Sequence, residues 1–368
     1  MAQRAIVVGG GIAGLTAAAA LGQAGWQVRV LERSAELGEV GAGLAVTVNG
    51  MRALAAIGAA DAVRAAGHAV RPAGARRADG TWLLKASDSP DELGQMLGIH
   101  RQRLHQALAS TAHDAEIITN ARVTSVDSSN VSWESPTGSQ TATADLVVGA
   151  DGIRSVVRDT LFPDHALTYS GYSSWRAVID DSTSDADRFA MVWGRRAEFG
   201  ALRISPTQIY WYGYVALPPG QRFPDELSAA REYFATWAPD IRALVDQTSP
   251  DQLLRHDVWE LGKPLPRYTQ GRTVLIGDAA HPMLPTLGQG ANSALEDDAS
   301  LGALGLREYE AARYRRTQQL VSRSVQMARV GAHLGSGRWL RNALMRIVPA
   351  GVAQRSGTRI LDWHPPTP

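Results

Sequence analysis

The segment RAIVVGGGIAGLTAAAALGQAGWQVRVLE, residues 4–32, decides the fold of this 368-residue chain. Residues 4–8 form an apolar run that predicts a short buried strand, and the glycines of residues 9–14 lead into an Ala- and Leu-rich helix. Residues 27–32 predict the next strand. A strand, a helix and a second strand in this order make a βαβ unit, so we expect the chain to begin with a parallel sheet.

The glycines of this unit have a defined spacing, Gly-x-Gly-x-x-Gly, and an acid ends the second strand. This is the Rossmann fingerprint: the glycines allow a tight turn and close approach of a pyrophosphate, and the helix N-terminus supplies N–H groups. The acid can accept hydrogen bonds from ribose hydroxyls. The predicted dinucleotide site consists of Gly9, Gly11, Ala13, Gly14, Glu32 and Arg33. The fingerprint alone does not distinguish NAD from FAD, and a tight turn without a ligand is the lesser alternative.

Size and composition describe an ordinary folded protein of two domains, or of one domain with a large insertion. The net charge of +1 gives no field that attracts nucleic acid or an anionic membrane. The absence of Cys excludes disulfides and cysteine nucleophiles, and the nine His residues show no pair with metal-ligand spacing. Without a signal peptide or an apolar stretch of ~18 residues, we expect a cytoplasmic protein with no metal, no nucleic acid and no membrane contact.

Further elements follow from apolar periodicity and turn residues. They are helices at 50–66 and 100–111, strands at 145–150 and 273–278, and long helices at 290–304 and 308–333. From about residue 168 to 262, clusters of Trp, Tyr and β-branched residues predict an antiparallel sheet inserted into the Rossmann body. The expected fold class is α/β, with a discontinuous Rossmann-type domain at 1–165 and 263–305, an antiparallel β-sheet substrate domain at 166–262, and a C-terminal helical region at 306–368.

A second glycine-acid element, VLIGDAAHPMLPTLGQGAN at residues 274–292, predicts a strand, an acid, a proline-fixed loop and a helix start. With it the chain resembles the group A flavoprotein monooxygenases, the para-hydroxybenzoate hydroxylase family, and within it the salicylate and urate hydroxylase-like enzymes. The resemblance implies that the acid binds the ribitol of FAD and that the helix start places N–H groups at the flavin, where a helix dipole stabilises its reduced, negative form. The residues implicated are Asp278, Gly288, Gly290, Ala291 and Asn292.

A third element, GADGIRSVVR at residues 149–158, resembles the Asp-Gly motif of the same family, which is associated with FAD and with transient NAD(P)H binding. The resemblance assigns its acid, Asp151, to that role. It also implies that Arg101 contacts FAD from a helix start, that Val123 offers a backbone contact to the adenine, and that Ala45 lies in the loop beside the isoalloxazine. Each alone is a weak signal, because such an Arg is usually solvated and such a Val is usually in a core.

The substrate side is expected on the strand around residues 209–214, IYWYGY, which alternates in the manner of a β-strand. Tyr210 and Tyr212 would share one face, either as the wall of an aromatic site or as ordinary sheet core. Glu198 stands where family members often carry Arg, and an acid there disfavours an anionic substrate. We therefore expect a neutral or cationic aromatic, with Glu198, Tyr210 and Tyr212 as the substrate residues.

Three other features are predicted to be structural. His281 titrates in the range of a general base, but the resemblance places it in the loop that shapes the flavin site, where hydroxylation does not require it. Residues 296–298, Glu-Asp-Asp, depart from the Glu-Asp-Ala of the family in a way a helix tolerates. An apolar stripe at 338–348 could touch a membrane or a lipophilic substrate, but we expect it to pack on the body of the protein.

The resemblance implies an FAD-dependent, NAD(P)H-consuming monooxygenase that inserts one oxygen atom of O2 into an aromatic or polyketide-like molecule through a flavin C4a-hydroperoxide. A flavin-dependent reductase or oxidase, and a non-catalytic flavin-binding protein, are the alternatives. The sequence assigns no catalytic base and does not choose between hydroxylation, epoxidation and Baeyer-Villiger insertion, or between NADH and NADPH. A monomer and a homodimer are equally compatible with it.

Overall fold

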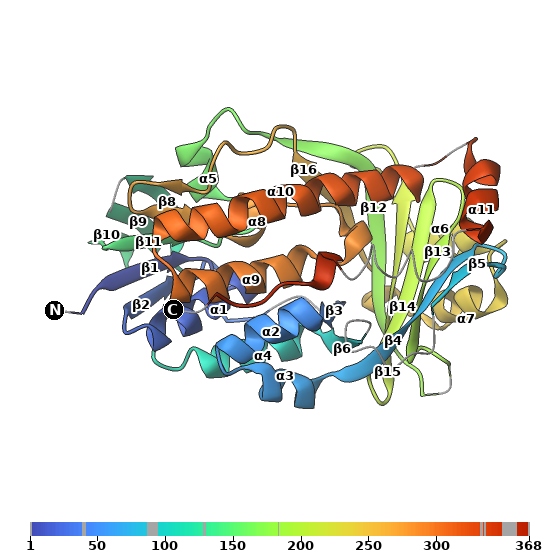
Figure 1. Cartoon of the computed structure of the whole chain (residues 1–368), viewed down its shortest axis with the longest axis horizontal. Helices are drawn as coiled ribbons and strands as arrows, with labels where there is room; N and C mark the ends of the chain where they lie inside the picture. The colour runs from blue at the N-terminus through green and yellow to red at the C-terminus, as the bar shows by residue number, and fades with distance from the viewer. Residues whose placement is uncertain are drawn as a thin grey trace.

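The computed structural model describes residues 2–38, 42–86, 95–127, 130–182, 184–331, 334, 336–347 and 359–366. A six-stranded sheet forms the part of the molecule nearest the N-terminus (Figure 1). Its strands, in spatial order, are β17 (Thr269–Gln270), β18 (Thr273–Leu275), β11 (Leu146–Gly149), β1 (Arg4–Val8), β2 (Gln27–Leu31) and β7 (Glu116–Ile118). All neighbours pair in parallel except β17, which is antiparallel to β18.

The predicted βαβ unit is present, because α1 (Ile12–Gln23) joins the parallel strands β1 and β2. Residues 5–8 of β1 are buried, as a strand covered on both faces requires. Helix α1 packs against α9 (Gly290–Ala303), and α10 (Leu306–Val330) packs on α9 in turn (Figure 1). The α/β fold class with a Rossmann-type unit is confirmed.

The second sheet has nine strands and contains the predicted inserted segment. In spatial order its strands are β16 (Leu254–Leu261), β12 (Leu167–Asp180), β15 (Gln208–Ala216), β14 (Ala197–Ser205), β13 (Arg188–Trp193), β4 (His68–Arg77), β6 (Met96–His100) and β3 (Gly43–Thr47), with β5 (Trp82–Lys85) paired to β4. The inserted strands pair antiparallel, but β13 pairs with β4 in parallel. The sheet thus extends beyond the insertion and includes strands of the N-terminal region. The domain boundaries given above remain a prediction.

One face of this sheet is covered by α6 (Glu226–Phe234) and α7 (Pro239–Gln247) through an apolar cluster that includes Trp211 and Phe234. The remaining elements are smaller. A three-stranded sheet consists of β8 (Arg122–Asp127), β9 (Asn130–Ser135) and β10 (Gly138–Thr143), and the other short elements are α4 (Arg101–Thr111), α5 (Val156–Leu161), η2 (Pro250–Gln252) and η3 (Pro285–Leu287).

Two predicted elements are interrupted at glycines. The helix expected at 50–66 is divided into α2 (Val48–Ala56) and α3 (Ala60–Ala66) near Gly58, whose φ of +71° is incompatible with a continuous α-helix. The strand expected at 273–278 ends at Leu275, and Gly277, with a φ of +55°, begins the short helix α8 (Gly277–Ala280). The second break turns Asp278 out of the sheet.

The C-terminal stripe does not pack as expected. Helix α11 (Arg338–Ile347) leaves Trp339, Leu340 and Leu344 exposed, and the position 348 of the stripe lies outside the described residues. Arg341 and Met345 hold the helix to the body instead, since Arg341 lies over the ring of Trp193 at 4.9 Å and Met345 joins the same small cluster. The expectation of a packed apolar stripe was therefore wrong.

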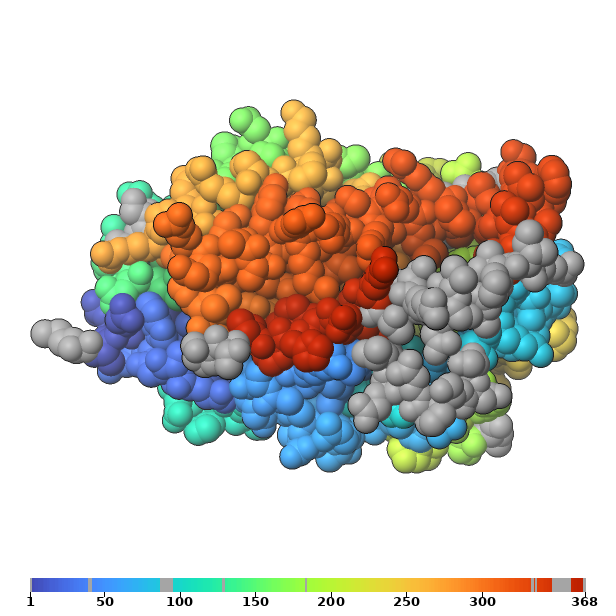
Figure 2. All heavy atoms as spheres, in the orientation of Figure 1, coloured from blue at the N-terminus to red at the C-terminus, as the bar shows by residue number. Residues whose placement is uncertain are grey.

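Residues 359–366 return to the N-terminal half and lie between α10 and α2 on the face shown in Figure 2. Arg316 of α10 donates to the carbonyl of Ile360, and Arg52 of α2 donates to that of Trp363. Among the described helices, none is both long and apolar enough to cross a bilayer.

Candidate active site

A cavity of about 700 Å³ lies where the carboxyl ends of β1, β2 and β11 face the inner side of the large sheet. Carboxyl ends of parallel strands are the usual ligand site of such folds. The predicted residues that line it are Gly9, Gly11, Ala13, Glu32, Arg33, Ala45, Arg101, Val123, Asp151, Tyr210, Tyr212, Asp278, Gly288, Gly290 and Ala291. The predicted residues Gly14, Glu198 and Asn292 are not among its lining residues.

The glycine turn is shaped by close backbone contacts. Gly9 has a φ of +103°, and a Cβ built on it would lie 2.6 Å from the carbonyl oxygen of Ala150. A Cβ on Gly14 would lie 1.8 Å from the carbonyl oxygen of Gly9, so Gly14 permits helix α1 to pack on the turn. The N-cap residue of α1, Gly11, has no side chain that could cap its N-terminus. Its first N–H groups are therefore available to an anion such as a diphosphate.

Glu32 holds the same turn from the end of β2. Its Oε2 accepts from the N–H of Gly10 at 2.7 Å, and its Oε1 accepts from the N–H of Ser34 at 2.8 Å. A carboxylate has about four acceptor positions, so it keeps capacity for ribose hydroxyls.

The carboxylate of Asp151 is engaged in hydrogen bonds within the protein. Its carboxylate accepts from the hydroxyl of Ser155 at 2.5 Å and from the N–H of Val157 at 3.1 Å. Burial raises the pKa of this carboxyl, while these hydrogen bonds act in the opposite direction. The side chain fixes the turn into α5, and this turn presents Gly152 and Arg154 to the cavity.

The N-terminus of α9 forms the opposite wall. Gly288, with a φ of +62°, has no atom within 4 Å of a built Cβ, so open space adjoins it. Asn292 faces away from the cavity: its Nδ2 donates to the carbonyls of Ala45 and Gly288 at 3.0 and 2.9 Å, and its Oδ1 accepts from Thr47. It thus ties β3 to the loop. The side chain of its N-cap residue, Gln289, makes no capping hydrogen bond, so the first N–H groups of α9 are available to a ligand.

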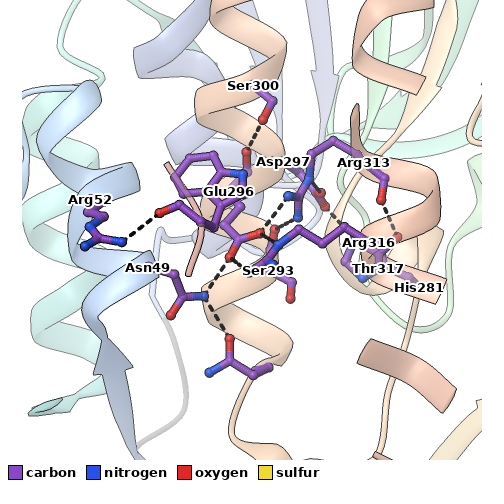
Figure 3. Close-up of polar contacts among 12 residues, drawn as sticks. Asn49, Arg52, His281, Ser293, Glu296, Asp297, Ser300, Arg313, Arg316 and Thr317 are labelled. Carbon is purple, nitrogen blue, oxygen red and sulfur yellow. Dashed lines mark hydrogen bonds and ion pairs between the residues drawn. The ribbon is translucent and has the colours of Figure 1, made fainter. Parts of the chain in front are cut away.

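A buried ionic network fixes α9 from beneath (Figure 3). Arg313 of α10 donates to Oδ1 of Asp297 at 2.7 Å and to Oε2 of Glu296 at 2.6 Å, and Arg316 also pairs with Glu296. Glu296, Asp297 and Arg313 are fully buried. Removing one partner of a buried ion pair leaves the other charge uncompensated and is strongly destabilising. The network therefore favours the packing of α9 on α10.

Asp297 links this network to the loop that carries Asp278. Its Oδ2 accepts from the N–H of Gly277 at 3.0 Å and lies 2.5 Å from Nε2 of His281. Burial alone would raise its pKa, but the charges of His281 and Arg313 lower the pKa of Asp297 overall. His281 does not line the cavity, in agreement with its predicted structural role.

The substrate end of the cavity has an aromatic wall on β15. Tyr210 and Tyr212 line it, whereas Trp211 points to the opposite face and stacks on Phe199. The hydroxyl of Tyr212 donates to Oε1 of Glu198 at 2.9 Å. Glu198 is 1% exposed, and burial raises its pKa to about 7. We expected Glu198 to be a substrate residue; it does not line the cavity, but it contacts Tyr212, which does.

Sequence reasoning missed the cation of this wall. Arg176 of β12 lies opposite Tyr212 in the strand register and lines the cavity. Within the described residues, neither a hydrogen bond nor an ion pair occupies its guanidinium. Apolar side chains complete this end of the cavity: Phe189, Met191, Leu202 and Met283. The alternation of residues along β12 predicts which of them share a face of the sheet. Only the pairing of β12 with β15 shows that Arg176 lies on the same face as Tyr212.

The family described as "FAD binding domain" matches residues 3–323. The chain belongs to this FAD-binding family. Its relatives within the family include the aurachin C monooxygenase/isomerase of Stigmatella aurantiaca, 33% identical over 98% of each chain. The 3-amino-4-hydroxybenzoate 2-monooxygenase of Streptomyces cremeus is 34% identical over 88% of this chain and 86% of the relative.

A solved flavoprotein of the same fold is HpxO of Klebsiella pneumoniae in complex with FAD and uric acid. It is 25% identical, with a TM-score of 0.86 over 98% of this chain and 96% of that chain. The resemblance to aromatic FAD monooxygenases is confirmed. The present flavoprotein is an FAD-dependent monooxygenase.

Proposed function

We propose that this enzyme uses NAD(P)H and O2 to insert one oxygen atom into an aromatic or polyketide-like molecule that carries an ionisable hydroxyl or ring N–H. One observation carries this proposal: a single cavity joins the glycine turn of β1 to the wall made by Arg176 and Tyr212. A dinucleotide cofactor and a polar aromatic can thus share one enclosed space. The Streptomyces relative, by its name, acts on an amino-hydroxybenzoate, and HpxO was solved with uric acid.

The residues present fit FAD. The uncapped N-terminus of α1 suits the diphosphate, Glu32 the adenosine ribose, and Asp278 the ribitol, while the uncapped N-terminus of α9 suits the flavin ring. Among the described residues, five arginines line the cavity against three acids, a balance that favours an anionic cofactor; they are Arg33, Arg101, Arg122, Arg154 and Arg176 against Glu32, Asp151 and Asp278. When bound, FAD supplies the two-electron chemistry and the activation of O2.

The substrate wall selects by hydrogen-bond polarity. The hydroxyl of Tyr212 donates its hydrogen bond to Glu198, so its oxygen presents lone pairs to the cavity. This arrangement favours a substrate that donates a hydrogen bond from O–H or N–H. Arg176 beside it stabilises negative charge that develops on the substrate oxygen. A neutral aromatic that becomes anionic on proton loss fits both groups. A cationic aromatic, which we had also considered from the sequence, is disfavoured by Arg176.

The same pair offers a path for that proton. As Tyr212 accepts the proton of the substrate, it passes its own hydroxyl proton to Oε1 of Glu198. A pKa of about 7 suits Glu198 to this exchange near neutral pH. Electron-rich rings accept oxygen more readily, so deprotonation prepares the ring. The apolar side chains around this end exclude water from the reacting centre.

The test uses the purified chain reconstituted with FAD. NADH and NADPH oxidation is measured alone and with phenols, hydroxylated N-heterocycles and polyketides. We expect one class of aromatic to accelerate oxidation and to yield a product heavier by one oxygen atom. Bound FAD without acceleration by any aromatic would favour a flavin-binding protein, and acceleration with H2O2 but no oxygenated product would favour an oxidase. A cytoplasmic location and a monomer or homodimer stay predictions, which fractionation and light scattering can test.

A further inference from the structure

Exposed apolar side chains are concentrated at one end of the molecule. Among the described residues, five large hydrophobic side chains are exposed, and four of them lie between residues 330 and 344. These four are Val330 at 50%, Trp339 at 72%, Leu340 at 49% and Leu344 at 51%. Figure 2 shows α11 at an extremity of the long axis of the molecule, remote from the N-terminus. A cluster of this kind indicates a surface that another phase or molecule covers.

The orientation of α11 is determined by polar anchoring. Arg341 donates to the carbonyls of Val330 and Gly331 at 2.9 and 3.0 Å, which satisfies the C-terminus of α10. Arg341 is 7% exposed, and Met345, one turn later, is half-buried beside Trp193. Residues 341 and 345 therefore face the protein. With residues 341 and 345 against the protein, the side chains of Trp339, Leu340 and Leu344 face solvent.

The side chains around this face carry mainly positive charge. A hollow of about 420 Å³ adjoins α11 and is lined by Trp339 together with Arg77, Arg195, Arg338 and Arg341. Of its described lining residues, Asp79 alone is acidic, and it pairs with Arg77. The net charge of the whole chain is only +1, so this end is basic against a nearly neutral background.

We propose that α11 docks this enzyme on the surface of an anionic phospholipid membrane. Trp339, Leu340 and Leu344 would enter the layer between headgroups and acyl chains, while Arg195 and Arg338 face the lipid phosphates. An amphipathic helix with Trp and Leu on one side and Arg beside it is the form of helix that lies in a membrane interface. The basic surroundings exclude a cationic or strongly basic partner. This proposal departs from the sequence expectation of no membrane contact, because the structure exposes the stripe that was expected to pack.

Two side-chain contacts connect the docking helix α11 to Glu198 behind the substrate wall. Trp193 lies under the guanidinium of Arg341, and its Nε1 donates to Oε2 of Glu198 at 3.0 Å. The carboxylate that accepts from Tyr212 is thus two contacts away from the docking helix. The membrane surface would adjoin the substrate end of the enzyme rather than the adenosine end.

The test is co-sedimentation of the FAD-loaded full chain with vesicles of phosphatidylcholine alone, or of phosphatidylcholine with phosphatidylglycerol. The test variants are a triple substitution, Trp339→Ser with Leu340→Ser and Leu344→Ser, and the charge reversal Arg338→Glu. The control is Arg64→Glu, which makes the same charge change on α3. Circular dichroism, bound FAD and substrate oxidation without vesicles verify that each variant is folded.

We expect the wild-type chain to favour the anionic vesicles by about tenfold or more, and about 0.5 M salt to release it. Both test variants should lose about tenfold in binding, and the Arg64→Glu control should bind like the wild type. The proposal is overturned if the wild-type chain stays in the supernatant, or if the triple variant binds as well as the wild type. It is also overturned if the triple substitution instead converts a dimer into a monomer, since a second copy would then cover this face.

Discussion

The hydroxyl of Tyr212 lies 2.9 Å from Oε1 of Glu198 and donates a hydrogen bond to that buried carboxylate. In the proposed function, this contact leaves the oxygen of Tyr212 as an acceptor towards the cavity and lets Glu198 take up a proton.

Replacing Glu198 by Gln should lower kcat by about 100-fold, because the amide keeps the size of the side chain but cannot take the proton. The wild-type rate should rise with pH through about 7, the pKa of Glu198, and this limb should be lost in the variant. Tyr212→Phe should produce a similar loss. The double variant should be no slower than either single one, since the two residues act as a unit. Steady-state rates between about pH 5 and 9 provide the measurement, and additive losses would refute the relay.

Replacing Arg176 by Gln should raise KM for the aromatic substrate by about 10- to 100-fold, the value of a hydrogen bond to a charged group. FAD content should stay at the wild-type level, because Arg176 lies at the substrate end. Arg176→Lys should restore part of the affinity. An unchanged KM would mean that the substrate does not contact this wall.

Gly14→Ala should reduce bound FAD and stability, since its Cβ would lie 1.8 Å from the carbonyl oxygen of Gly9. Gly22→Ala in the same helix is the matched control: a Cβ there has no atom within 4 Å, and Ala favours a helix by about 1 kcal/mol. Flavin absorbance per protein and thermal midpoint compare the two. Equal flavin content in both variants would contradict the tight turn.

Asp298→Ala should stabilise the protein by about 1–3 kcal/mol near neutral pH, because both carboxylate oxygens of this fully buried residue have no hydrogen-bond partner among the described residues. Burial and the charge of Asp297 raise the pKa of Asp298 well above 3.8. The wild-type protein therefore loses stability as pH rises from about 4 towards the folded-state pKa, and the gain from Ala should grow over the same range.

The neighbouring Asp297→Ala is the contrast, because it removes the partner of Arg313 and His281 and should cost about 3–5 kcal/mol. Denaturant unfolding at several pH values measures both variants. A gain at Asp298 that does not change with pH would show that the pKa of its carboxyl is not raised in the folded protein.

Much of the fold was predictable because its signals are local. The apolar strand before Gly9, the glycine spacing and the acid at Glu32 each depend on a short stretch, and the structure has β1, α1 and β2 there. The breaks at Gly58 and Gly277 were missed because a single glycine does not reveal its φ in the sequence.

The substrate wall was predictable only in part. Tyr210 and Tyr212 follow from strand alternation, but Arg176 reaches them through a pairing of β12 with β15 that the sequence does not specify. The same reasoning failed at α11, where helical periodicity showed an apolar stripe but not which side the buried Arg341 would select. Asp298 was expected to be a tolerated change on a helix, and the sequence did not reveal that it is buried. Long-range packing decides each of these cases.

The most direct test of the central claim is the fate of labelled oxygen. The FAD-loaded enzyme is incubated with NAD(P)H, the accelerating aromatic and isotopically labelled O2, and the product is examined by mass spectrometry. The proposed function predicts one labelled atom in the aromatic product for each NAD(P)H consumed. Label found only in water or H2O2 with the aromatic unchanged, or oxygen in the product that comes from the solvent, would contradict it.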